Sequence, residues 1–245
     1  MRLAGKVAIV TGGTKGLGHA IAQAYAKEGC RVVCAARHPD ERHELPPVGG
    51  GDLAFHPVDV RDPDSVDALT RTTYETYGRL DVLVANAGLS RPGPAERLDP
   101  ADWSDVIATN LNGTFLSVRS AVPYLERSGD GRVITLSSAL ATRVARGSSA
   151  YAASKAGIEM FTKVVAVELA GRPVTVNCLS PGFVDEGMGR QLTANRDLWD
   201  YYRGKIAAGR PGQGAEVAEA AVFLAAEGSR YVNGHVLEVN GGLSW

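Results

Sequence analysis

The chain has 245 residues, of which 44% are hydrophobic and 22% are charged, with 26 Lys and Arg against 27 Asp and Glu. This composition is typical of a globular protein and excludes disordered and fibrous classes. The net charge of −1 argues against nucleic acid or an anionic membrane as the main partner. The longest uncharged run, Val106 to Val118, has 13 residues, whereas a helix that spans a membrane needs roughly 20.

The cysteines predict a reduced, cytoplasmic chain that holds no metal. Cys30, Cys34 and Cys178 have no CxxC spacing of the kind that metal sites use. If Cys30 and Cys34 share one strand they lie about 13 Å apart, too far for a disulfide. The apolar run from Val7 to Val10 is too short for the core of a signal peptide.

Short β-branched runs alternate with longer amphipathic segments along the chain. The predicted strands are residues 7–10, 31–36, 54–58, 82–85, 132–137, 175–179 and 236–239. The predicted helices are residues 18–28, 65–77, 101–127, 151–170 and 215–226. This alternation predicts an α/β fold, a doubly wound and mostly parallel sheet with helices on both faces. We expect one domain over residues 1–245, in which the Pro- and Gly-rich segment 46–51 replaces a helix with a loop.

A glycine-rich turn follows the first predicted strand and opens the first helix. Glycines there allow a tight turn and a close approach of the backbone to a pyrophosphate at the helix N-terminus. The spacing is GxxxGxG instead of GxGxxG, and ordinary turns also contain such clusters, but the place between strand and helix favours dinucleotide binding. The turn residues predicted to bind the cofactor are Gly12, Thr14, Lys15, Gly16, Leu17 and Gly18.

The end of the second predicted strand bears on which dinucleotide is bound. This strand end lies beside the adenosine ribose in dinucleotide folds, where an acidic residue accepts a hydrogen bond from the 2′-hydroxyl. Here Ala36 and Arg37 stand at that place, and Lys15 lies in the glycine turn. Two cations without a carboxylate suit a 2′-phosphate, so NADPH is favoured over NADH. The alternative is that both are ordinary solvated cations.

Tyr151 and Lys155 lie at positions i and i+4 of a predicted helix, and therefore on one face of it. An ammonium group near a phenol stabilises the phenolate and lowers the pKa of the tyrosine from about 10. Such a pair can protonate a carbonyl oxygen, although the same spacing also occurs in simple surface contacts. Ser138 follows the strand 132–137, at the strand end where ligands of open α/β sheets bind.

Along essentially its whole length the chain resembles a short-chain dehydrogenase/reductase of the single-domain branch. The glycine motif resembles Thr11 to Gly18, the NNAG motif matches Asn86 to Gly88 after Ala85, and YxxxK matches Tyr151 and Lys155. The catalytic Asn and Ser of the family match Asn110 and Ser138, and Pro181-Gly182 resembles the segment over the nicotinamide. The closing residues 238–242 resemble those of 3-oxoacyl-carrier-protein reductases.

The resemblance implies a Rossmann-like, seven-stranded parallel sheet and a homotetramer or homodimer. It also implies delivery of the pro-S hydride of the reduced nicotinamide to a carbonyl group. Tyr151 would be the general acid, Ser138 would bond the carbonyl oxygen, Lys155 would bind the ribose and lower the pKa of Tyr151, and Asn110 would hold a water. The further cofactor-binding residues that it implies are Asp59, Val60, Asn86, Ala87, Gly88, Pro181, Gly182 and Val184.

Departures from the family pattern and the substrate loop leave alternatives open. Glu186 stands where the family has a Thr that bonds the carboxamide or the diphosphate. In the expected substrate loop, about residues 183–210, an aromatic cluster lines a pocket or else packs a lid or a subunit contact. The apolar and aromatic residues of that cluster are Leu192, Leu198, Trp199, Tyr201 and Tyr202. Arg127 and Arg172 match basic positions that face a carrier protein, or are solvated charges.

The sequence therefore predicts an NADP-dependent ketoreductase acting on a small-molecule ketone or an acyl thioester. The rival readings are a 3-oxoacyl-carrier-protein reductase, an NAD-dependent alcohol dehydrogenase, and a dinucleotide-sensing regulator. A regulator has no need of Ser138, Tyr151 and Lys155 together, and all three are present.

Overall fold

A seven-stranded, all-parallel sheet in the order β3-β2-β1-β4-β5-β6-β7 organises the protein. The computed structural model describes residues 1–41, 45–49, 51–190 and 196–244. The strands are β1 Val7–Thr11, β2 Arg31–Ala36, β3 Leu53–Pro57, β4 Val82–Ala85, β5 Gly131–Leu136, β6 Val174–Pro181 and β7 Val236–Val239. All seven predicted strands are confirmed to within a few residues, and β1, β4 and β5 are buried throughout because helices cover both faces.

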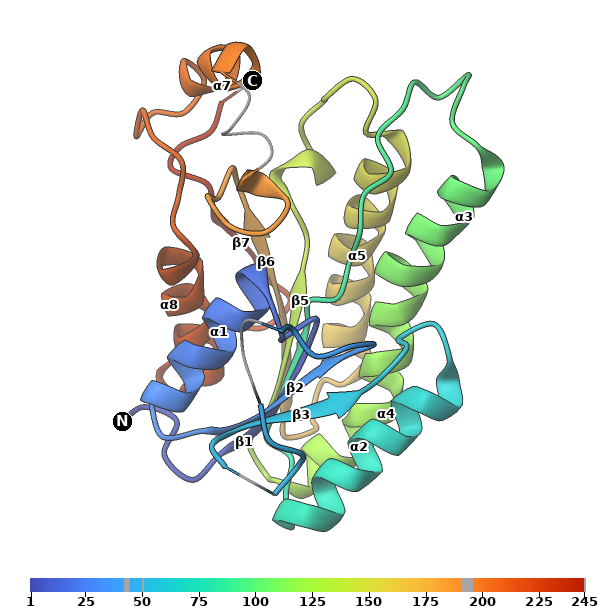
Figure 1. The fold of residues 1–245 in the computed structure, drawn as a ribbon. Helices are drawn as coiled ribbons and strands as arrows, with labels where there is room; N and C mark the ends of the chain where they lie inside the picture. Colours follow the sequence, from blue (N-terminus) through green and yellow to red (C-terminus); the bar gives the residue numbers. More distant parts are fainter. Residues whose placement is uncertain (42–44, 50, 191–195, 245) are drawn as a thin grey trace.

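The helices form two layers, with α1 and α8 on one face of the sheet and α2, α4 and α5 on the other (Figure 1). Their bounds are α1 Gly16–Lys27, α2 Pro63–Tyr77, α3 Pro100–Ile107, α4 Gly113–Arg127, α5 Ser149–Glu168, α7 Arg196–Arg203 and α8 Gly214–Ala225. Tyr25 and Val222 belong to the core on the first face, and Leu69 and Val165 belong to the core on the second. The predicted doubly wound, Rossmann-like architecture is confirmed.

The predicted helix 101–127 is interrupted at a place that its sequence pattern did not indicate. A π-helical segment, Ala108–Asn112, joins α3 to α4. Such insertions displace a side chain relative to a regular α-helix, and they are frequent at functional sites. The displaced segment contains Asn110.

The segment between β2 and β3 contains no helix among its described residues, as the Pro and Gly content predicted. The backbone amide of Phe55 donates to Pro46, and the amide of Gly49 donates to the hydroxyl of Tyr77, so this loop packs beside β3 and α2. The three cysteines are free and buried, which agrees with the predicted absence of a disulfide. No helix in the described part of the chain is long and apolar enough to cross a membrane.

Candidate active site

The glycine turn between β1 and α1 has the geometry that close backbone contact requires. Gly12 and Gly16 have positive φ angles of 65° and 56°, which side-chain-bearing residues rarely adopt. A methyl group on Gly18 would collide with the carbonyl oxygen of Gly12 and the amide of Asn86. The turn therefore depends on glycine at each of these positions.

Thr11 and Asn86 tie the glycine turn to the end of β4. The Thr11 hydroxyl accepts hydrogen bonds from the backbone amides of Asn86 and Ala87 at 3.0 and 3.1 Å. The Asn86 side-chain amide donates to the carbonyl of Thr11 at 2.9 Å. These contacts place the segment Asn86 to Gly88 beside the turn.

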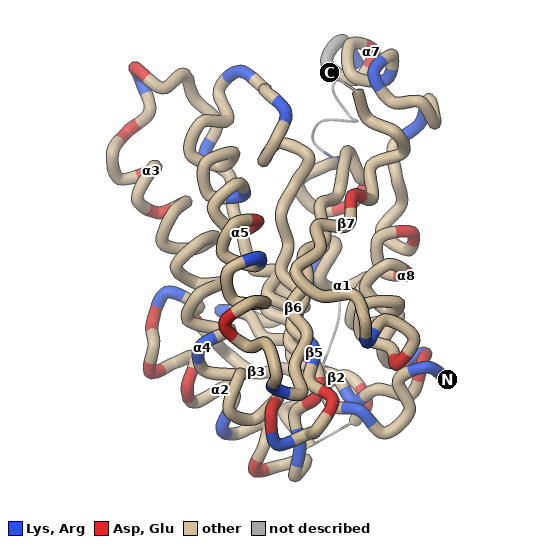
Figure 2. The backbone as a smooth tube through the Cα atoms, turned by 180° about the vertical axis from the view of Figure 1, so that it is seen from behind, with Lys and Arg blue, Asp and Glu red and all other residues tan. Residues whose placement is uncertain are grey.

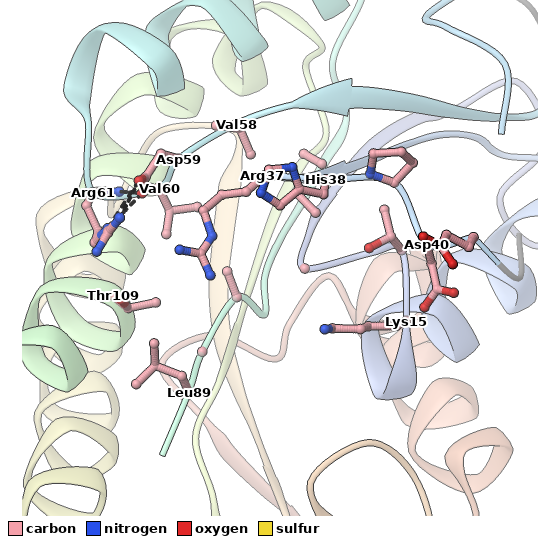
Figure 3. A pocket seen from close by; sticks show the side chains of 18 residues that line it. Lys15, Arg37, His38, Asp40, Val58, Asp59, Val60, Arg61, Leu89 and Thr109 are labelled. Carbon is pink, nitrogen blue, oxygen red and sulfur yellow. Dashed lines mark hydrogen bonds and ion pairs between the residues drawn. The ribbon is translucent and has the colours of Figure 1, made fainter. Parts of the chain in front are cut away.

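A cavity of about 620 Å³ opens at the C-terminal ends of β1, β2 and β3 (Figure 3), a size that accommodates a nucleotide-sized ligand. Eight of the residues predicted to bind the cofactor line it, namely Gly12, Thr14, Lys15, Arg37, Asp59, Val60, Ala87 and Gly88. The predicted residues outside its lining are Gly16, Leu17, Gly18, Asn86, Tyr151, Lys155, Pro181, Gly182 and Val184.

Arg37, directly after β2, and Lys15, in the glycine turn, both reach the cavity with their charged ends (Figure 3). Two carboxylates, Asp40 and Glu41, line the same cavity, and sequence reasoning missed them. The sequence feature that could have revealed these two carboxylates is their position shortly after β2, in the loop that replaces the usual helix. The ribose end of the cavity is therefore not purely basic.

A chain of ion pairs borders the cavity beyond Asp59. Arg61 contacts Asp59 at 2.6 Å and Asp105 at 3.1 Å, and Arg91 contacts the other oxygen of Asp105 at 3.1 Å. The hydrogen bonds from Arg61 lower the pKa of Asp59 to about 2. Asp59 is therefore ionised, with both carboxylate oxygens bonded to a guanidinium. Arg61 was not predicted as part of the site.

Asn110 is fully buried in the π-helical segment and bonds the loop after β4. Its side-chain oxygen accepts from the backbone amide of Leu89 at 2.8 Å, and its amide donates to the Leu89 carbonyl at 2.9 Å and to the Ser154 hydroxyl at 3.0 Å. A methyl group on Gly88 would lie 3.2 Å from the Asn110 oxygen and 3.6 Å from Lys155 Nζ. Gly88 therefore leaves open a narrow space that Asn110 and Lys155 border.

Ser138, Tyr151 and Lys155 meet where β5 ends against α5. The Ser138 hydroxyl accepts from the backbone amide of Leu140 at 3.2 Å and forms a side-chain hydrogen bond with Tyr151. Lys155 is 4% exposed, its Nζ donates to the Leu136 carbonyl at 2.7 Å, and burial lowers its pKa to about 8. Burial raises the pKa of Tyr151 above 10, while the bond with Ser138 opposes that rise.

The segment after β6 crosses from the sheet to α8. The backbone amide of Gly182 donates to Val239 at 3.0 Å, and Val184 bridges to Gly212. Glu186 is partly buried, packs against Gly214 at the start of α8, and contacts Arg190 at 3.3 Å. The following residue, Gly187, lies against Gly16 of the glycine turn. Glu186 is thus held in place near the turn by an ion pair.

The aromatic cluster of the predicted substrate loop packs largely against itself. The rings of Phe183 and Tyr202 have their centres 4.6 Å apart, and those of Tyr201 and Tyr202 are 5.1 Å apart. Phe183 and Trp199 pack on a small core of Ala139, Ile206 and Leu243. Ala139 is the residue directly after Ser138. This packing favours the lid alternative for Tyr202, while Phe183 packs against the core that contains Ala139. Leu192 and the side chain of Leu198 lie outside the described residues.

Arg127 and Arg172 lie apart from this edge of the sheet. The Arg172 guanidinium bonds Glu126 at 2.8 Å, and the Arg127 guanidinium lies over the rings of Tyr74 and Tyr124. Arg127 also lines a separate groove of about 480 Å³ between α2 and α4. The structure does not bring the two arginines to the site.

Comparisons with known proteins agree with this architecture. A family model described as enoyl-(acyl carrier protein) reductase matches residues 12–244. The 3-oxoacyl-(acyl carrier protein) reductase FabG of Vibrio cholerae is 35% identical over 243 residues, 99% of each chain. The D-threitol dehydrogenase of Mycolicibacterium smegmatis is 38% identical over 249 residues, 98% of this chain and 94% of that protein.

A solved structure has the same fold over nearly the whole chain. The ligand-free aldohexose dehydrogenase of Thermoplasma acidophilum has a TM-score of 0.89 and 30% identity, covering 98% of this chain and 94% of that chain. The glycine turn, the strand-end cavity and the motifs along the sequence thus agree with full-length relatives. The chain belongs to the short-chain dehydrogenase/reductase family, and it is an oxidoreductase that acts on CH–OH or C=O groups.

Proposed function

We propose that the protein uses NADPH to reduce a ketone to a secondary alcohol, with Tyr151 as the general acid. The observation that carries the proposal is the meeting of Ser138, Tyr151 and Lys155 at the end of β5, with Lys155 Nζ and the Asn110 oxygen bordering the space beside Gly88. Ligands of open α/β sheets bind at such strand ends. A serine, a tyrosine and a lysine there supply a hydrogen-bond donor, a proton and a cation.

The residues present fit a phosphorylated dinucleotide. Gly12 and Gly16 give the turn the positive φ angles of a tight, phosphate-binding loop, and the cavity extends from Gly12 to Arg37. In this proposal Lys15 and Arg37 hold the 2′-phosphate, and Asp59 and Val60 face the adenine. The other turn residues, Thr14, Leu17 and Gly18, would hold the diphosphate. Asn86, Ala87 and Gly88 would hold the ribose, and Pro181, Gly182 and Val184 would lie at the nicotinamide.

When bound, the reduced nicotinamide supplies a hydride to the carbonyl carbon. Tyr151 gives its phenolic proton to the carbonyl oxygen, and the Ser138 hydroxyl donates a hydrogen bond to the same oxygen. Burial raises the pKa of Tyr151, so the phenol holds its proton until the oxygen becomes basic. Lys155 binds the ribose hydroxyls, and Asn110 holds the water from which the proton of Tyr151 is replaced.

The specific substrate class that we propose is a 3-oxoacyl thioester, because the relatives from Vibrio cholerae and Escherichia coli are named 3-oxoacyl-(acyl carrier protein) reductases. The partly buried apolar side chains of Phe183 and Trp199, packed beside Ala139, suit an aliphatic chain more than a free sugar. The second candidate is an NAD-dependent alcohol dehydrogenase, since other relatives are named as dehydrogenases of threitol and aldohexose. The carboxylates of Asp40 and Glu41 in the ribose cavity favour that alternative.

The proposal also covers the organisation of the chain. We expect residues 1–245 to act as one dinucleotide-binding domain, with the region 183–210 as its substrate loop. Exposed apolar side chains on α4 and α5, among them Phe115, Met160 and Val167, offer a surface for a homotetramer or homodimer. Free, buried thiols are those of a chain in a reducing compartment, which supports a cytoplasmic location.

The test is a panel assay with the purified protein. NADPH and NADH oxidation would be followed with simple ketones, β-keto esters and β-ketoacyl thioesters, and NAD⁺ and NADP⁺ reduction with threitol and aldohexoses. The proposal expects β-ketoacyl thioesters with NADPH to give the highest kcat/KM. Turnover of the polyols with NAD⁺ alone would establish the second candidate in its place.

A further inference from the structure

A buried carboxylate lies one helical turn beyond Lys155, and the reaction proposed above does not use it. Tyr151, Lys155 and Glu159 stand at i, i+4 and i+8 of α5, and therefore on one face of that helix. Glu159 is 9% exposed, and a glutamate is rarely buried to this extent unless it is paired. It makes no salt bridge within the described part of the chain, and its hydrogen-bond partner is the Ser137 hydroxyl at 2.8 Å.

Ser137 is the residue between β5 and the serine that meets Tyr151. Its hydroxyl lies 2.8 Å from the Glu159 carboxylate and 3.2 Å from the backbone carbonyl of Lys155. The carbonyl of the preceding residue, Leu136, accepts from Lys155 Nζ. Leu136 and Ser137, at the end of β5, are therefore hydrogen-bonded to Lys155 and Glu159, which lie on two consecutive turns of α5.

A second pair joins the same strand and helix further from the site. Thr135 and Thr162 share a hydrogen bond of 2.7 Å between their hydroxyls, and both side chains are fully buried. Because side chains alternate along a strand, Thr135 and Ser137 both face α5. The Thr135–Thr162 pair thus provides a comparison, since it joins the same elements without touching Ser138, Tyr151 or Lys155.

We propose that Glu159 is a positioning residue, whose carboxylate holds Ser137 so that Ser138 stands at the correct distance from Tyr151. The inference rests on the proposed function, because it assigns Glu159 to the reaction that Ser138 and Tyr151 perform. Ser138 has extended backbone angles, φ −162° and ψ 154°, and follows Ser137 directly. A rotation of the backbone at Ser137 therefore moves the hydroxyl of Ser138. Misplacement of a catalytic group by about 1 Å can cost on the order of 10²-fold in rate.

The proposal explains why an acceptor is kept at a buried position. Burial of a carboxylate costs free energy that one hydroxyl donor offsets only in part. A side chain of similar length without polar atoms would pack there at lower cost, but it would leave the Ser137 hydroxyl with only its bond to the Lys155 carbonyl. We therefore assign to the Glu159 carboxylate the role of holding Ser137 at the end of β5, and not that of stabilising the core.

The test compares Glu159→Met, Glu159→Gln and Ser137→Ala with Thr162→Val as the matched control. We expect Glu159→Met and Ser137→Ala each to lower kcat by roughly ten- to a hundredfold, with KM for the cofactor within about threefold of the original protein. Glu159→Gln keeps an acceptor for the hydroxyl and should retain kcat within about threefold. Thr162→Val should lower Tm like the other substitutions and leave kcat unchanged.

The Glu159→Met/Ser137→Ala double variant should lose no more kcat than either single variant, because both remove the same contact. Three results would overturn the positioning role: unchanged kcat in Ser137→Ala, equal loss of kcat in Thr162→Val, or Glu159→Gln as slow as Glu159→Met. Ser137→Ala and Glu159→Gln carry the test if Glu159→Met does not fold. Tyr151→Phe is measured in parallel, and full turnover in that variant refutes the proposed function independently of Glu159.

Discussion

Lys155 Nζ lies 5.6 Å from the centre of the Tyr151 ring and donates its hydrogen bond to the carbonyl of Leu136. The sequence predicted that this ammonium lowers the pKa of Tyr151. In the arrangement described, burial raises that pKa and only the bond with Ser138 opposes it, so the predicted direction is wrong there. The lysine instead has its own pKa lowered to about 8 by burial, which has a consequence for cofactor binding.

Binding of NADPH should weaken as the pH rises through the pKa of Lys155. A charged ammonium bonds ribose hydroxyls more strongly than a neutral amine does, and the lysine loses its proton near pH 8. We expect a constant Kd near pH 7 and a rise of up to about tenfold per pH unit above pH 8. Fluorescence titration from about pH 7 to 9.5 avoids the 2′-phosphate, which titrates near pH 6. Lys155→Met should bind weakly at every pH, and a flat profile in the original protein contradicts the assignment.

Tyr151→Phe should keep the fold and the affinity for NADPH while losing most turnover. The phenyl ring preserves the packing, and general acid catalysis is worth about 10²–10⁴-fold. The measurement is kcat on the best ketone of the panel, with NADPH titration and thermal unfolding as controls for binding and folding. Turnover within a fewfold of the original protein would remove Tyr151 from the role of acid.

NADPH should bind at least about tenfold more tightly than NADH, since one charge-assisted contact with a phosphate contributes about 1.5–3 kcal/mol. Arg37 carries this preference from the end of β2, with its guanidinium in the cavity (Figure 3). The double substitution Ala36→Asp with Arg37→Val should reverse the preference in a fluorescence titration.

The matched control for that substitution is Arg31→Val, which removes the same charge at the opposite end of β2 and should leave both dissociation constants unchanged. Equal affinities of the original protein for the two cofactors would show that Asp40 and Glu41 cancel the effect of Arg37 and Lys15.

The sheet could be predicted from the sequence because its strands are buried on both faces. Runs such as Val7 to Val10 and Val82 to Ala85 contain only apolar residues, and no solvent-facing position interrupts the pattern. The helix 101–127 was predicted as one element because its periodicity continues through the π-helical segment at Asn110. The segment Ala108–Asn112 contains neither Gly nor Pro, so no helix-breaking residue marks the interruption in the sequence.

The charged surroundings of the site could not be predicted in the same way. Arg61 bonds Asp59 two residues away but also Asp105, which is distant in sequence. Such a chain of ion pairs depends on how α3 lies against the loop after β3. Figure 2 shows how basic and acidic residues are distributed along the backbone, α2 and α3 included. Motifs placed Ser138, Tyr151 and Lys155, whereas the bond between Ser137 and Glu159 required the packing of α5 on β5.

Glu186 offers a test of how a charge near the glycine turn affects cofactor binding. Its neighbour Gly187 lies against Gly16, which puts Glu186 near the turn that we expect to hold the diphosphate, and its carboxylate contacts Arg190 at 3.3 Å. We expect Glu186→Thr to tighten NADPH binding several-fold at low salt, with a smaller gain at high salt because ions screen the repulsion.

The contribution of Arg190 separates this explanation from a local change of structure. Arg190→Ala exposes the carboxylate charge, so it should weaken NADPH binding in the original protein by several-fold. The same substitution should have little effect in the Glu186→Thr background, where no charge remains to be neutralised. Titrations of the four proteins at low and at high salt measure the coupling between the two residues. If all four bind NADPH equally at low salt, Glu186 is a solvated residue of the substrate loop, and its charge does not reach the diphosphate.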